Sequence, residues 1–173
     1  MGLIFTEMTC PSADARITEG CPGMWTDTQE EGWKDIVGFI HANSGAKVAM
    51  QLGHAGRKGS TQLGWEEMDA PLNDGNWPLL SASALAWSER NATPEAMTRS
   101  QMDEICEAFV SSTHMAEAAG FDMIELHAAH GYLISSFISP YNEDRRKVRL
   151  MAPEYFHNVH IKASVEACEK RDV

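Results

Sequence analysis

Three short apolar segments, separated by amphipathic ones, constrain the fold of this chain more than any other feature. Residues 2–8, 46–52 (AKVAMQL) and 121–127 (FDMIELH) are almost continuously apolar. Strands that are buried on both faces of a parallel sheet have this pattern, whereas half-exposed strands alternate apolar and polar residues. We therefore expect three adjacent, parallel strands.

Two amphipathic segments between these strands each begin with a helix-capping signal. Thr26 and Thr98 are each followed by a glutamine three residues later, and apolar residues then recur at helical intervals. The sequence predicts helices over residues 28–43 and 99–118. Strands that alternate with helices indicate an α/β fold with right-handed crossovers, so both helices should cover one outer face of the sheet.

The connection over residues 53–97 is unusually long for a compact domain. It contains Trp65, Trp77 and Trp87, and loops of this length are usually either functional or disordered. The tryptophans favour an ordered loop, and we interpret them as packing residues rather than as a cofactor-binding set.

Charge and cysteine content narrow the functional class. The 173 residues carry a formal net charge of −11, which argues against nucleic acid as a partner because phosphate-backbone binders present basic surfaces. No apolar run is long enough to predict a membrane span. The cysteines form no close pair of the C-x-x-C kind, so we expect reduced thiols in a cytoplasmic protein (Cys10, Cys21, Cys106 and Cys168).

Polar or otherwise distinctive residues lie where the predicted strands end. Met8 ends the first strand, Gln51 lies near the end of the second, and His127 ends the third and is followed by His130. In α/β barrels the chemistry lies at this end of the strands. From the residues alone Gln51 is an amide that satisfies neighbouring backbone groups or a ligand-binding group. The histidines are structural, bind an organic anion or carbonyl, or bind zinc, although no third metal ligand is evident.

Three glycines follow the second strand at positions 53, 56 and 59. Lys58 precedes the last of them, which is the wrong order for a phosphate-binding P-loop. We interpret the glycines as a strand exit that lets a ligand approach the backbone.

Two stretches carry a family resemblance. Residues 51–58 (QLGHAGRK) resemble the Q-L-x-H-x-G-R signature of Old Yellow Enzyme-like NADH:flavin oxidoreductases, and residues 125–133 (ELHAAHGYL) resemble the second signature of that family. The resemblance implies a TIM (β/α)8 barrel, of which residues 1–140 would be an incomplete fragment of about three β/α units. Residues 141–173 would form a divergent C-terminal helical segment.

The sequence of the long connection resembles that of a particular subfamily. GRKGSTQLGWEE and GNWPLLSASAL look like the reductase half of bifunctional anthraniloyl-CoA or salicylyl-CoA monooxygenases, in which an FAD monooxygenase part precedes the barrel. This resemblance implies a small-molecule substrate derived from an aromatic CoA thioester, and a fused partner domain in the longer protein.

The resemblance also implies a cofactor and residue roles. The family uses FMN, with NADH or NADPH as reductant, and passes a hydride to an activated alkene or aromatic substrate. Gln51 would hydrogen-bond the pyrimidine edge of the flavin, and Met8 would lie against its ring. His127 and His130 would donate hydrogen bonds to the carbonyl or phenolate oxygen of the substrate, and Tyr132 would supply the proton.

The sequence departs from the family after residue 140. The family continues with an Arg-x-Asp-x-Tyr-Gly-Gly pattern, whereas this chain reads YNEDRRK without the two glycines. Three alternatives therefore stay open. The chain is part of a flavin enzyme, an inactive truncated remnant or interaction domain, or a metal-dependent barrel hydrolase that uses the two histidines.

Overall fold

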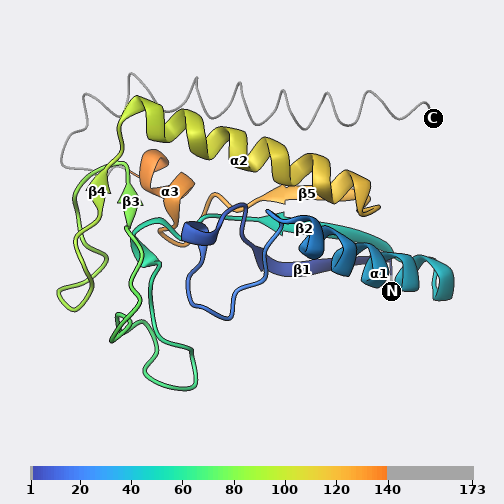
Figure 1. The fold of residues 1–173 in the computed structure, drawn as a ribbon, viewed down its shortest axis with the longest axis horizontal. Coiled ribbons are helices and arrows are strands. Elements are labelled where there is room, and N and C mark those ends of the chain that lie inside the picture. Colours follow the sequence, from blue (N-terminus) through green and yellow to red (C-terminus); the bar gives the residue numbers. More distant parts are fainter. Residues whose placement is uncertain (1, 140–173) are drawn as a thin grey trace.

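A three-stranded parallel sheet forms the centre of the molecule. The computed structural model describes residues 2–139, in which β1 (Leu3–Thr9), β2 (Lys47–Leu52) and β5 (Met123–Leu126) pair in the order β1-β2-β5 (Figure 1). Both pairings are parallel. The predicted strands and their parallel arrangement are confirmed, and their ends differ from the prediction by one or two residues.

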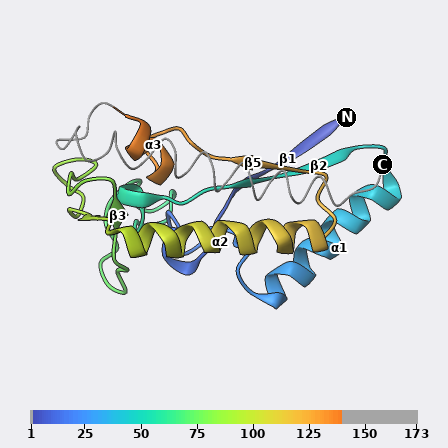
Figure 2. The same ribbon diagram turned by 90° about the horizontal axis from the view of Figure 1, so that it is seen from above.

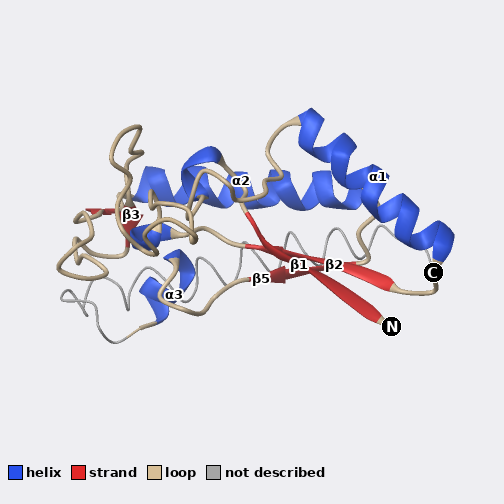
Figure 3. Cartoon of the chain, turned by 90° about the horizontal axis from the view of Figure 1, so that it is seen from below, coloured by secondary structure: helices blue, strands red, loops and turns tan. Residues whose placement is uncertain are grey.

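Two long helices cover the same face of this sheet. They are α1 (Asp27–Asn43) and α2 (Arg99–Ala118), and Figures 2 and 3 show both on one side of the strands. Both predicted capping boxes are formed, with the side chains of Thr26 and Thr98 accepting from the backbone three residues later. The helix predictions are therefore confirmed to within one residue at each end.

The hydrophobic core lies between the helices and the sheet. Among the helices, α2 contributes most of the buried apolar side chains of this core. Alternate residues of β2 point toward α2 and pack against them (Met102, Ile105 and Phe109 from α2; Val48, Met50 and Leu52 from β2). α1 buries one residue, Val37, so it covers the edge of the core rather than its centre. No helix in the described range is long and apolar enough to cross a membrane.

The opposite face of the sheet is apolar at one end and polar at the other. Phe5, Ala49 and Met123 form one row across the three strands, and Gln51 and Glu125 form the next row toward the strand ends. Phe5 is 45 % exposed and Met123 is 41 % exposed. Rows of side chains of this kind fill the interior of a (β/α)8 barrel, so this is the face that a barrel would enclose.

The long connection contains more structure than the sequence predicts. It includes a 3-10 turn, η2 (Gly56–Lys58), and two strands of two residues each, β3 (Leu80–Ser81) and β4 (Glu95–Ala96), which pair in parallel. A short helix, α3 (Leu133–Ile138), follows β5. These elements gather at the end of the sheet where the three strands finish (Figure 1). Elements this short show no periodicity, which is why the sequence did not predict them.

The loop tryptophans differ in their surroundings. Trp77 lies under the Arg16 guanidinium at 4.7 Å, and Trp87 packs against Gly131, whereas Trp65 is 81 % exposed. The expectation that all three are packing residues is therefore wrong for Trp65. The predicted C-terminal helical segment, residues 141–173, lies outside the described residues.

Candidate active site

The residues predicted to form the site meet at one end of the sheet. Met8 pairs with Gln51 in the register of β1 and β2, and the backbone N–H of His127 donates to the carbonyl of Leu52 at 2.8 Å. His130 follows in the next turn and hydrogen-bonds His127. The expectation that these four side chains share one rim is confirmed.

Gln51 lies on the face of the sheet that the helices do not cover. Its Nε2 donates to Glu125 Oε2 at 3.1 Å, and its backbone N–H donates to the Thr6 hydroxyl at 3.1 Å. The amide therefore bonds a side chain on the next strand rather than the neighbouring backbone. Because Gln51 stays partly exposed, its amide can present one donor and one acceptor to a planar ligand.

The glycines after β2 allow protein segments to approach one another. A Cβ at Gly53 would lie 2.6 Å from Met8 Cγ and 3.1 Å from His127 Cβ. A Cβ at Gly56, whose φ is +60°, would lie 2.9 Å from the backbone of Leu133. The close approach to these two glycines is made by protein segments, namely β1, His127 and α3. That a ligand also approaches the backbone here stays a prediction.

The two histidines are bonded to each other. His130 Nδ1 lies 3.1 Å from His127 Nε2, and the backbone N–H of Ala129 donates to His127 Nδ1 at 3.2 Å. Since His127 Nδ1 accepts, its proton is on Nε2, and that proton is donated to His130 Nδ1. His130 Nε2 then carries the remaining proton of the pair.

A tight turn places His130 in this position. His130 and Gly131 both have positive φ, 58° and 75°, and the backbone N–H of Tyr132 donates to the carbonyl of Ala129 at 3.2 Å. Two consecutive positive φ values are the mark of a type I′ turn, and the left-handed region is unfavourable for histidine. The structure accepts this strain at a residue of the candidate site, which is where such strain is often found.

Tyr132 packs beside the two histidine rings. Its ring meets the His127 ring edge to face, with 4.8 Å between centroids, and Lys58 Nζ lies 5.2 Å from the tyrosine ring centre. Burial raises the pKa of Tyr132, and negative charge from Cys21 adds to the effect. A phenol with a raised pKa keeps its proton at neutral pH, as a proton donor must.

Burial lowers the pKa of His127, and the neighbouring His130 lowers it further. Because desolvation disfavours the imidazolium form, His127 is neutral at pH 7. A neutral imidazole can still donate a hydrogen bond to an oxygen that develops negative charge.

Sequence reasoning missed three residues around this group. Glu125 is the hydrogen-bond partner of Gln51, Lys58 lies over the rings of Trp87 at 4.3 Å and Tyr132, and Trp87 packs on the turn at Gly131. A signal was available for Glu125, because it is two residues before His127 in the predicted strand over residues 121–127, and residues two apart on a strand point to the same face. No sequence signal connects Trp87 with a turn more than forty residues later.

Two further features bear on alternative sites. Within residues 2–139, no three His, Cys, Asp or Glu side chains come together as metal ligands, so the zinc hypothesis has no third ligand in the described part.

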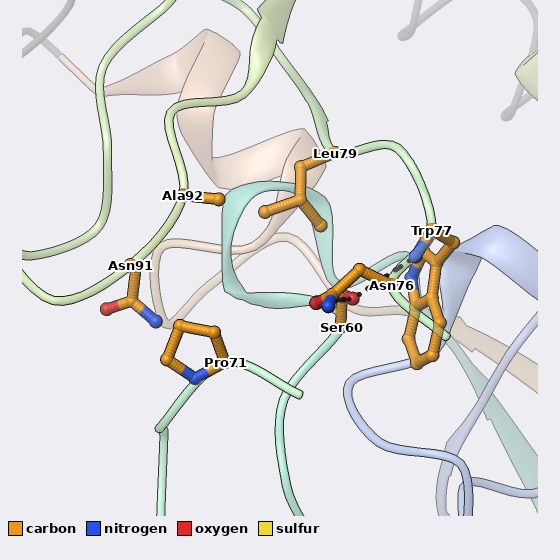
Figure 4. Close-up of a pocket in the computed structure, with 8 residues that line it drawn as sticks. Ser60, Pro71, Asn76, Trp77, Leu79, Asn91 and Ala92 are labelled. Atoms are coloured by element: carbon orange, nitrogen blue, oxygen red, sulfur yellow. Dashed lines mark hydrogen bonds between the residues drawn. The ribbon is translucent and has the colours of Figure 1, made fainter. Parts of the chain in front are cut away.

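A cavity of about 90 Å³ lies in the long connection, where Ser60 bonds Asn76 and the backbone of Trp77 (Figure 4). It contains none of the predicted site residues.

Comparison with known proteins identifies relatives in sequence. The family model described as "NADH:flavin oxidoreductase / NADH oxidase family" matches residues 1–147. An NADPH dehydrogenase of a Geobacillus species is 36% identical over 154 residues, which cover 89% of this chain and 41% of that protein. An NADPH dehydrogenase of Halalkalibacterium halodurans is 41% identical over 145 residues, which cover 84% of this chain and 38% of that protein. The chain thus spans about two fifths of the length of these relatives.

Solved structures show the same fold. The Old Yellow Enzyme of a Pichia species superposes with a TM-score of 0.79 at 31% identity, covering 96% of this chain and 44% of that one. Morphinone reductase in complex with tetrahydroNAD superposes with a TM-score of 0.77 at 30% identity, covering 95% and 48%. The predicted fold class, part of a TIM (β/α)8 barrel, is confirmed.

Proposed function

Because this chain belongs to the NADH:flavin oxidoreductase / NADH oxidase family, we propose that it forms the substrate-binding side of an FMN-dependent ene-reductase site. The observation that carries the proposal is the meeting of Gln51, His127, His130 and Tyr132 at the carboxyl ends of parallel strands. NADH or NADPH is the proposed reductant. A cytoplasmic location is part of the same proposal and is supported by the free thiols of the described residues.

The residues present fit one edge of FMN. The partly exposed Gln51 amide offers a donor and an acceptor, which matches the alternating carbonyl and N–H groups of the pyrimidine ring. Met8 is paired with Gln51 and only 9% exposed, so its proposed role is to form an apolar floor beneath the ring. When bound, FMN supplies the hydride for reduction of an activated alkene.

The histidines and the tyrosine have separate proposed roles. His130 Nε2–H, and His127 Nε2–H when a ligand displaces the contact between the rings, donate to the substrate oxygen and stabilise its developing negative charge. Tyr132 keeps its proton because its pKa is raised, and it gives that proton to the α-carbon.

We further propose an aromatic CoA-derived substrate and a fused FAD monooxygenase domain in the longer protein. The amino-acid sequence of the long connection, through its resemblance to that subfamily, supports both. The structure adds one cation beside Tyr132, since Lys58 Nζ lies 5.2 Å from the tyrosine ring centre. Lys58 and Arg57 also lie over Trp87, at 4.3 and 5.2 Å. An anionic substrate group would find opposite charge there.

The test uses FMN-saturated protein and a phenol as substrate mimic. Replacing His127 and His130 together by alanine should weaken phenol binding by ~10- to 100-fold, the equivalent of one or two hydrogen bonds to a charged oxygen, while FMN stays bound. His114→Ala, on the exposed face of α2, is the matched control. Loss of FMN binding with unchanged phenol affinity would overturn the roles.

A second candidate function is that of an inactive remnant or interaction domain. It is favoured by the uncovered apolar row, in which Phe5 and Met123 are more than two-fifths exposed. Exposed apolar sheet surface pairs with other chains. The 173-residue chain by itself should then self-associate and bind FMN only weakly, because a few neutral hydrogen bonds contribute about 1 kcal/mol each. A monodisperse monomer with submicromolar FMN affinity would exclude this candidate.

A further inference from the structure

Two thiols lie together just beyond the end of β1, outside the residues assigned to the reaction. Cys10 is fully buried and Cys21 is partly exposed. The chain between them makes a loop that returns to its start, because Cys10 N–H donates to the carbonyl of Pro22 at 2.9 Å and Met24 N–H donates to the carbonyl of Cys10 at 2.9 Å. These two backbone bonds lie on either side of Gly23 and hold the segment that directly follows Cys21 against Cys10.

The Cys21 sulfur lies among hydrogen-bonding groups of Thr18. Cys21 Sγ accepts from the Thr18 backbone N–H at 3.5 Å and contacts the Thr18 hydroxyl at 3.9 Å. The neighbouring Cys10 side chain lowers the pKa of Cys21 to about 5, whereas Cys21 and burial raise the pKa of Cys10 above its ordinary value. A thiolate with a thiol against it combines a nucleophile with a resolving group.

The surroundings keep the pair apart from other thiols and close to the candidate site. Met8 and Ala15 are buried with Cys10 in one small apolar cluster, and Tyr132 packs against that cluster together with Cys21. Arg16 and Glu7 are the charged groups that act on Cys10, in opposite directions. The third thiol in the described residues, Cys106, is buried in the separate core beneath α2.

We propose that Cys10 and Cys21 form a reversible dithiol–disulfide pair, with Cys21 as the peroxide-reactive thiolate and Cys10 as the resolving thiol. The Cys21 thiolate attacks one oxygen of a hydroperoxide, so that an S–O bond forms, the O–O bond breaks and hydroxide or alkoxide leaves. Cys10 sulfur then displaces the hydroxyl group of the Cys21 sulfenic acid, forming the S–S bond and releasing water. Two sulfurs are oxidised by two electrons in total, and the hydroperoxide is reduced.

Formation of the disulfide would act on the small apolar cluster of Met8, Cys10 and Ala15, against which Tyr132 packs. It removes the negative charge of Cys21 and fixes the loop that carries it. This consequence for the candidate site rests on the proposed function, whereas the thiol chemistry does not depend on flavin.

Peptide mapping of the 173-residue chain tests the pair directly. Trypsin cuts after Arg16, so Cys10 and Cys21 fall in separate peptides, residues 1–16 and 17–34. After brief treatment with one equivalent of hydrogen peroxide and alkylation without reductant, these two peptides should appear as one cross-linked species that dithiothreitol separates. Cys106→Ser should leave the cross-link unchanged. Cys10→Ser should abolish it and allow dimedone to trap a sulfenic acid on Cys21.

Three results would overturn the proposal. One is a Cys21 that reacts with peroxide no faster than Cys106 in the same sample. Another is a dimedone adduct on Cys21 of the unaltered chain without any cross-link to residues 1–16. A third is a disulfide from Cys21 to a cysteine other than Cys10. Because all of these are measured by mass on apoprotein, they are independent of whether the chain binds FMN.

Discussion

His54 should make the stability of this protein fall steeply between pH 7 and pH 5. The side chain is 2% exposed, its Nδ1 accepts from the Gly56 backbone N–H at 3.0 Å, and its buried Nε2 has no hydrogen-bond partner in the described part of the chain. Burial lowers the pKa of His54 from 6.5 to about 4, and the negative charge of Asp14 only partly opposes this. Protonation would place an imidazolium ion in a site that holds a neutral ring.

The size of the effect follows from linkage between proton binding and folding. The unfolded chain takes up the proton near pH 6.5 and the folded chain near pH 4, so the stabilisation is complete above pH 6.5 and is lost as pH falls toward 4. Integrating between pH 7 and pH 5 gives a loss of about 2 kcal/mol in the free energy of unfolding. His127 has a lowered pKa as well and contributes with the same sign.

Urea unfolding at pH 7 and pH 5, followed by circular dichroism, measures this loss. The informative variant is His54→Asn, because the Asn Oδ1 can replace Nδ1 as acceptor for Gly56 while the titrating ring is removed. It should be less stable at pH 7 because of the lost volume, yet its stability should fall by about 2 kcal/mol less than that of the unaltered protein between the two pH values. His114→Asn, on the exposed face of α2, is the control and should leave the pH dependence unchanged.

The reasoning would be refuted if His54→Asn and the unaltered protein lost equal stability from pH 7 to pH 5. Such a result would mean that His54 binds a proton in the folded state as readily as in the unfolded state. Proton NMR of the His54 ring gives a second check, because its resonances should not titrate above pH 5.

Three other predictions concern the frame of the site. Gly56→Ala should destabilise the protein by more than ~2 kcal/mol in thermal unfolding, since its Cβ would meet the Leu133 backbone at 2.9 Å and its φ is +60°. Gly32→Ala, whose Cβ would lie in open space on α1, is the control and should stabilise the protein by ~0.5–1 kcal/mol. A Gly56→Ala variant that is more stable than the unaltered protein would contradict the packing of Gly56 on Leu133. Thr98→Ala should cost ~1 kcal/mol in urea unfolding through loss of the capping box on α2, and no change would show that the cap contributes nothing. Phe5→Ser should reduce concentration-dependent self-association in gel filtration, because Phe5 is 45% exposed; unchanged elution would place the contact elsewhere.

The elements that could be predicted are those whose signals are local. Each strand of the main sheet is a largely apolar run, and each long helix has its own capping box, so neither depends on distant residues. The convergence of Gln51 and His127 followed from the parallel order of the strands alone, because parallel strands finish at the same edge. Residue roles came from the family resemblance rather than from spacing, which left a structural, an anion-binding and a metal-binding interpretation open for the histidines.

What could not be predicted depends on contacts between distant segments. The glycines after β2 are there because Met8 approaches Gly53 and Leu133 approaches Gly56, and neither neighbour is visible in the local sequence. The tautomer of His127 likewise depends on the Ala129 backbone N–H and on a turn with two positive φ values.

The long connection contributes more to the candidate site than its sequence indicated. Trp87 packs so closely on Gly131 that a Cβ there would lie 2.5 Å from the indole, and Gly131 is the second residue of the turn that holds His130 against His127. Lys58, from the start of the same connection, lies over both Trp87 and Tyr132. The loop therefore sets the direction of His130, the proposed oxygen-binding donor, and the charge beside Tyr132, the proposed proton donor. Since loops tolerate sequence change better than the strands they join, variation within residues 53–97 would alter the surroundings of the proposed substrate site while Gln51 and the histidines stay in place.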